Sequence, residues 1–167
     1  MNIYEYQRPV GKIDDIPELK SKFIDIYDTK SHKEMVQFCM ALGHHILDVT
    51  GLKPCYEITA SFEAMQKWID GNVNYHESRN LSFEIGRLAK VENDHIKARF
   101  FRTMAQVAAS PHVKYHGLWA TDFAITLINR MYPDNMDEVR KEREKQIEIL
   151  KKIGINATCH IKIPVKR

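Results

Sequence analysis

Signals that begin and end helices recur along this chain and constrain its fold more than any other feature. Ser31 and Glu34 form a capping-box pattern, in which each side chain accepts a hydrogen bond from the other residue's backbone. This pattern predicts a helix that runs to Thr50 and ends at Gly51, because glycine readily adopts the left-handed conformation common at helix ends. Similar signals predict helices from about residue 55 to 71, from 110 to 132, from 135 to 153 and, shorter, from residue 15.

Three stretches give local signals for where helices begin. The stretch Asn74–Glu77 repeats the capping-box pattern and predicts the start of a helix. Whether Asn93–Asp94 begins another helix or lies within the same long one stays open. Ser110–Pro111 predicts the start of the next helix, with serine as the cap, because the missing N–H of proline costs nothing in the first turn.

The expected fold is all-α: one domain over residues 1–167, built as a compact orthogonal bundle of about six helices. Residues 1–17 are expected to form an N-terminal arm, which is a candidate for contacts in a homo-oligomer. Residues 157–167 are the expected C-terminal tail, where an alternating His-Ile-Lys-Ile run predicts a short strand. A composition of 44% hydrophobic and 28% charged residues is typical of a globular protein.

Charge and hydropathy narrow the classes of partner. The chain has no apolar run of about 20 residues, and its N-terminus lacks the apolar stretch of a signal peptide. We therefore expect a cytoplasmic protein without a membrane partner. The net charge is only +3, so the sequence predicts no nucleic-acid partner.

The segment from Pro111 to Met131 carries the most informative helical pattern. Three small residues, Gly117, Ala120 and Ala124, lie in the middle of its apolar arc. This pattern predicts the central and most buried helix, which another helix can approach closely. Because a glycine inside a helix costs roughly 1 kcal/mol relative to alanine, Gly117 implies a packing reason for its presence.

Histidines are the strongest indication of a metal in the sequence. His112 and His116 lie four residues apart, the spacing at which two helical side chains can share a metal ion. The HExxH motif is absent, and hydrogen bonds to neighbouring helices explain both side chains more simply, so no cofactor is expected. The alternative is a metal-dependent helical enzyme whose site combines these two histidines with His44 and Asp48.

Catalytic motifs are missing, so the sequence predicts no catalytic residues and a protein that is not an enzyme. The chain contains no nucleophile elbow and no glycine-rich phosphate loop. Its cysteines, at positions 39, 55 and 159, form no CxxC pair, so neither a zinc knuckle nor a disulfide framework is indicated. Scattered carboxylates, among them Asp122, and the mixed-charge run 140–145 are interpreted as solvated helix faces.

Three stretches of sequence match patterns of one protein family. Residues 31–47 predict a helix with a charged start and the run Cys39-Met40-Ala41. Residues 108–117 contain small residues, then histidine-valine, a second histidine and a small residue. Residues 142–146 match an acidic-Arg-x-Trp-Gln pattern, with Lys145 in place of the tryptophan. In these stretches the chain resembles the immunity proteins of bacterial polymorphic toxin systems, small helical antidotes encoded beside secreted toxins.

The resemblance implies an all-α fold and a cognate toxin as partner, which the protein would neutralise by direct complex formation. It also implies that His112, His116, Arg143 and Gln146 form a polar set that binds the partner or holds the helices together. We expect Arg143 or Gln146 to bond one of the two histidines, because buried polar groups need hydrogen-bond partners. Such a bond would link the last two helices.

Large aromatic residues are the candidates for contacts with that partner. Exposed aromatic side chains often anchor protein–protein interfaces. Trp68, Tyr75 and Trp119 are the expected anchors, and packing in the core is the alternative for each of them.

Overall fold

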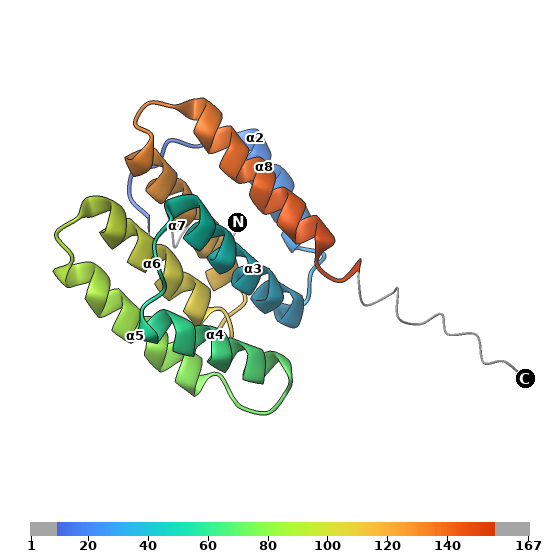
Figure 1. Ribbon diagram of the computed structural model, residues 1–167. Helices are drawn as coiled ribbons and strands as arrows, with labels where there is room; N and C mark the ends of the chain where they lie inside the picture. The colour runs from blue at the N-terminus through green and yellow to red at the C-terminus, as the bar shows by residue number, and fades with distance from the viewer. Residues whose placement is uncertain (1–9, 156–167) are drawn as a thin grey trace, which may run out of the picture.

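In the computed structural model, which describes residues 10–155, this range folds into seven α-helices and contains no strand (Figure 1). The all-α prediction is confirmed, with seven helices in the described range instead of about six. The predicted strand in the C-terminal tail lies outside the described residues. The helices are α2 (Pro17–Tyr27), α3 (His32–Thr50), α4 (Tyr56–Ile69), α5 (His76–Val91), α6 (His95–Ala109), α7 (His116–Met131) and α8 (Met136–Lys152).

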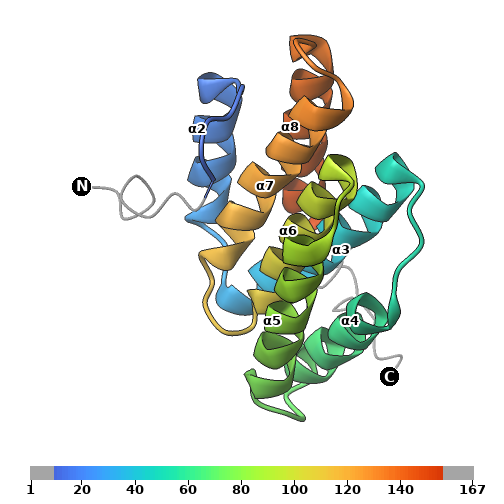
Figure 2. The ribbon, with the colours of Figure 1, turned by 90° about the vertical axis from the view of Figure 1, so that its left-hand side faces the viewer.

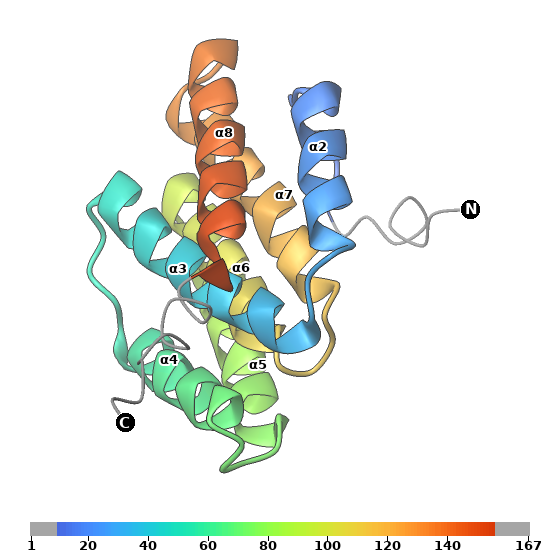
Figure 3. The same cartoon turned by 90° about the vertical axis from the view of Figure 1, so that its right-hand side faces the viewer.

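Helix α3 crosses the bundle and packs against α4, α6, α7 and α8 (Figure 1). On one side of the molecule, α5, α6 and α7 are consecutive neighbours, and α4 packs against α5 (Figure 2). On the other side, α2 lies alongside α8, which in turn packs against α7 (Figure 3). Helix α7 therefore lies between the α5–α6 pair and the α2–α8 pair.

Local capping explains where several helices begin and end. The capping box at α3 forms as predicted: the Ser31 hydroxyl accepts from the Glu34 N–H, and the Glu34 carboxylate accepts from the Ser31 N–H, both at 3.1 Å. Gly51 ends the helix with a φ of 67°. Asp94 caps α6 by accepting from two backbone N–H groups of its first turn. The chain therefore restarts at Asp94, and α5 and α6 are separate helices.

Two predicted helix starts are wrong in detail. Ser110 ends α6 instead of beginning α7, and its hydroxyl donates to the carbonyl oxygen of Val107 at 2.8 Å. Turns in residues 110–115 then bring the chain back against α6, so that α7 begins only at His116. At α5, the Asn74–Glu77 capping box does not form, because the asparagine carbonyl accepts from the N–H two residues on without a reciprocal bond.

Helix α7 is the buried centre of the fold, as its small residues predict. Every residue from Gly117 to Ile128 except Trp119 is buried. A Cβ added at Gly117 would lie 2.8 Å from the terminal carbon of Met35 and 3.4 Å from the sulfur of Cys39, both on α3. The glycine therefore permits the close approach of α3, which is the packing reason that its position implied.

The described part of the predicted N-terminal arm, residues 10–16, lies on the bundle. Asp14 and Asn129 of α7 exchange two hydrogen bonds, each 3.0 Å long, between the backbone of Asp14 and the Asn129 amide. Val10 and Ile16 are buried. This segment also carries Asp15 into contact with α8, where the most buried charges of the described chain meet.

Candidate functional site

Arg143, on α8, is the centre of a buried ionic network. Its side chain is 0% exposed and is the largest fully buried side chain of the described residues. It donates a bidentate pair of bonds to Asp15, at 2.9 and 2.7 Å, and a third bond of 2.7 Å to Asp122 of α7. Lys20 of α2 binds the other oxygen of Asp122, also at 2.7 Å. One guanidinium thus joins α8, α7 and the segment before α2.

Gln146 and Glu142 extend this network toward α3. The Gln146 carbonyl oxygen accepts from Arg143 at 3.0 Å, and its amide donates to Glu142 at 3.0 Å and to the Thr121 carbonyl oxygen at 3.3 Å. The second oxygen of Glu142 lies 2.7 Å from Nε2 of His45 on α3. Side chains from five parts of the fold, namely α2, the segment before it, α3, α7 and α8, therefore satisfy one another in the interior.

The electrostatics of Asp15 follow from this arrangement. Burial alone would raise the pKa of its carboxyl group. The hydrogen bonds and positive charge of Arg143, with smaller contributions from the Ile16 N–H and the charge of Lys20, outweigh that effect and hold the pKa of Asp15 below its ordinary value of 3.8. The carboxylate is therefore ionised at neutral pH, and its negative charge compensates the buried guanidinium.

The expected bond between this network and the two histidines does not occur in the described range. Arg143 and Gln146 meet α7 at Thr121 and Asp122, beyond the first turn that contains His116. A buried guanidinium is stabilised best by carboxylates, and Asp122 supplies one. The interpretation of Asp122 as a solvated carboxylate is wrong, since it is only 3% exposed. The run 140–145 is likewise not wholly solvated, because Glu142 and Arg143 are buried.

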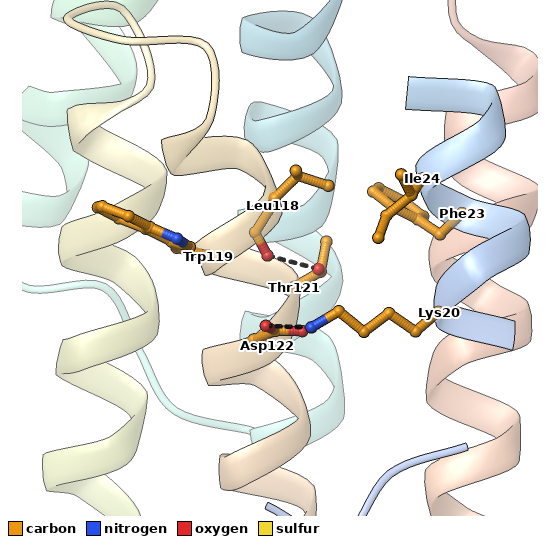
Figure 4. Close-up of a pocket in the computed structure, with 7 residues that line it drawn as sticks. All are labelled: Lys20, Phe23, Ile24, Leu118, Trp119, Thr121 and Asp122. Carbon is orange, nitrogen blue, oxygen red and sulfur yellow. Dashed lines mark hydrogen bonds and ion pairs between the residues drawn. The ribbon is translucent and has the colours of Figure 1, made fainter. Parts of the chain in front are cut away.

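A small cavity lies beside this network, between α2 and α7 (Figure 4). Phe23, Ile24 and Leu118 line its apolar side, and the Lys20–Asp122 ion pair lies at its edge (Figure 4). Its volume is about 10 Å³, roughly the space that one water molecule needs. This cavity is therefore too small to bind a substrate or a cofactor.

The two predicted histidines belong to a second group of side chains, which joins the starts of α5 and α7. We call Tyr75, His112, Tyr115, His116 and Trp119 the imidazole–aromatic cluster. Ring centroids are 4.8 Å apart for Tyr75 and His112, 6.0 Å for His112 and His116, and 5.2 Å for His116 and Trp119. Tyr115 lies 4.5 Å from Trp119 and completes the cluster.

Both histidines of the cluster favour the neutral form. Burial, with a smaller contribution from the charge of His112, lowers the pKa of His116 to about 4. Burial and nearby cations, Arg79 first, also lower the pKa of His112. Nδ1 of His116 lies 2.8 Å from the side-chain amide oxygen Oε1 of Gln106. Because that oxygen can only accept a hydrogen bond, we assign the proton to Nδ1.

The structure does not assemble the metal site of the alternative hypothesis. His44 is exposed and stacks on Phe62, with ring centroids 4.5 Å apart, while His112 and His116 lie in the imidazole–aromatic cluster. Asp48 is exposed on α3. Within residues 10–155, no group of three or more His, Cys, Asp or Glu side chains is arranged to hold a metal ion.

The three predicted interface aromatics are all half-buried. Trp68 packs on His32, with ring centroids 4.8 Å apart, and Tyr75 packs on His112. The indole N–H of Trp119 is buried and has no hydrogen-bond partner among the described residues. Sequence reasoning missed Phe83 of α5, which is 50% exposed. The available signal was its position among the polar residues of an amphipathic helix.

Phe83 lies in an open groove formed by α5, α6 and α7. The groove has a volume of about 410 Å³, and its lining combines apolar, neutral polar and basic side chains without a carboxylate. The basic residues are Arg87, Lys90 and Arg102, all of which are exposed. His116 brings one edge of the imidazole–aromatic cluster to the groove.

Fold and groove together define the class of this protein: an all-α bundle, fixed by a buried ionic network, that presents a basic groove. None of the described helices combines the length and apolar character that a membrane span requires. Residues 25–153 match the model of a family described as "Imm-5 like putative immunity protein". The chain belongs to this immunity-protein family. No curated protein and no solved structure matches the chain.

Proposed function

We propose that this protein neutralises a cognate bacterial toxin in the cytoplasm by forming a direct complex with it. The observation that carries the proposal is the family match, which spans residues 25–153 and therefore all of α3 to α8. The proposal requires a stable scaffold with an accessible surface, and no chemistry of its own.

The geometry supports binding as the mode of action. The buried network around Arg143 satisfies its charges internally, which suits a part that maintains the shape of the bundle. The imidazole–aromatic cluster has neutral rings packed against one another. The exposed cations of the groove, in contrast, make no ion pair with other described residues and are available to a partner.

Co-expression tests this proposal directly. Toxin domains encoded by genes adjacent to the gene for this chain are expressed in a bacterial host, with and without the chain. We expect the chain to restore growth against one of these toxins, and the purified pair to form a complex of defined stoichiometry by light scattering. Inhibition of the purified toxin should saturate at that stoichiometry, because a binding inhibitor acts by occupancy.

Two outcomes would contradict the proposal. Failure to protect against every adjacent toxin would remove the cognate partner. Protection without a complex, with turnover of many toxin molecules per chain, would instead indicate an enzyme that modifies the toxin.

A further inference from the structure

The groove between α5, α6 and α7 concentrates positive charge on one face of a chain that is nearly neutral overall. Arg87, Lys90 and Arg102 line it, whereas the net charge of the whole sequence is +3. Near Arg102, burial and the charges of Arg130 and Arg102 lower the pKa of the Arg99 guanidinium, so Arg99 lies close enough to each of these two cations to be repelled by it. An anionic partner would relieve this repulsion.

An exposed aromatic ring lies among these cations. Phe83 is 50% exposed, lines the groove, and has the guanidinium of Arg79 4.9 Å from its ring centre. Burying such a ring on association removes apolar surface from water, and aromatic residues, phenylalanine included, and arginine are enriched at protein–protein interfaces. The groove therefore offers an apolar anchor and a charged rim together.

The size and chemistry of the groove favour a protein segment as its occupant. A volume of about 410 Å³ accommodates a few side chains, and the lining includes apolar Ala105, Ala109 and Phe123 beside the cations. A nucleic-acid strand would instead require a longer basic track with several stacking rings. Because the charged side chains of the groove are basic, charge complementarity favours a segment that carries acidic residues around an apolar one.

We propose that this groove receives an acidic segment of the toxin, with Phe83 packing against an apolar side chain and Arg87, Lys90 and Arg102 pairing with carboxylates. This proposal rests on the proposed function, because the toxin is the partner. It assigns the specificity of the complex to the α5–α7 face and leaves the α2–α8 face outside the contact.

Exposed-residue variants test the assignment without disturbing the core. Phe83→Ala and the double variant Arg87→Glu/Arg102→Glu are compared with wild type and with Arg140→Glu, an exposed charge reversal on α8. Binding to the toxin against which the chain restores growth is measured by surface plasmon resonance at several salt concentrations, and urea unfolding checks that each variant is folded. We expect Phe83→Ala to raise the dissociation constant at least tenfold and the double variant to lower the association rate constant at least tenfold at low salt. The control should change each of these two constants less than twofold.

The outcomes separate the two proposals. Tight wild-type binding that both groove variants retain would overturn the docking site and leave neutralisation intact. If no toxin binds, the proposal that the protein neutralises a toxin fails. An NMR titration with a short Asp/Glu-rich peptide containing one Phe then tests whether the groove binds acidic segments. Shifts confined to groove amides, abolished by the double variant and absent with a basic peptide, would support it as an acidic-segment site. No shifts, or equal shifts with a 12-nucleotide single-stranded DNA of mixed sequence, would overturn it.

Discussion

Replacing Arg143 with methionine is the sharpest test of how this bundle is held together. Methionine keeps much of the length and apolar contact of the arginine stem but removes the guanidinium. The change deletes five hydrogen bonds, two to Asp15 and one each to Asp122, Thr121 and Gln146. All five link α8 to itself, to α7 or to the segment before α2.

The size of the effect follows from the charges left behind. Removing one partner of a buried ion pair typically costs about 3–5 kcal/mol, because the other charge stays buried without compensation. Asp122 keeps its 2.7 Å bond to Lys20, whereas Asp15, whose side chain is 8% exposed, loses its arginine. We therefore expect a loss of about 3 kcal/mol in the free energy of unfolding, near the lower end of that range. Since a domain is stable by only about 5–15 kcal/mol, this loss should be easy to measure.

Urea unfolding followed by circular dichroism gives the required free energies. Arg140→Met, an exposed change on the same helix, is the matched control and should stay within about 0.5 kcal/mol of wild type. In the double variant Arg143→Met/Asp15→Asn the uncompensated carboxylate is gone, so the total loss should be smaller than the sum of the single losses by at least about 1 kcal/mol. A loss below about 1 kcal/mol for Arg143→Met, or strict additivity in the cycle, would refute the ionic network as a source of stability.

Two further predictions concern pH and packing. Because burial holds the pKa of His116 at about 4, the unfolded chain binds an extra proton between about pH 6.5 and pH 4, so stability should fall as the pH drops through that window. Urea unfolding at several pH values should show a shallower decline for His116→Gln, and an unchanged slope would contradict the assignment. Gly43→Ala should lower the unfolding free energy by about 1–2 kcal/mol, because its Cβ would lie 2.8 Å from the rigid ring of Phe62. Gly117→Ala should cost less, since its Cβ meets the flexible end of Met35, whereas the gain of about 1 kcal/mol from the helix propensity of alanine is common to both sites; equal losses at the two sites would count against this reasoning.

Helix positions were predictable here because their causes are local. The bonds between Ser31 and Glu34 span three residues, so the pattern of residue types contains the whole interaction. The bonds of Asp94 are equally local, spanning two or three residues, but the sequence left open whether a helix begins there. Ser110 shows the limit of this reasoning. A serine followed by proline can begin a helix or follow the end of one, and only the return of α7 against α6 decides between them.

The ionic network was not predictable, because its partners are distant in sequence. Arg143 and Asp15 are 128 residues apart, and Arg143 and Asp122 are 21 residues apart on different helices. Helical periodicity can place Asp122 on a face of α7 but cannot show that α8 brings a guanidinium to it. The groove was missed for the same reason, since three helices have to meet before the exposure of Phe83 has any meaning.

The polar residues of this bundle include two physically different groups, the buried network around Arg143 and the exposed cations of the groove. Arg143 and Gln146 are buried, and any change there leaves other polar groups without partners, so these positions constrain the fold. Arg87 and Arg102 are exposed and bond no member of that network, so reversing their charge should alter stability by only about 0.5 kcal/mol. A bundle divided in this way can change the partner that its groove accepts while its interior stays the same. Specificity for one toxin among related ones is then expected to depend on the α5–α7 face.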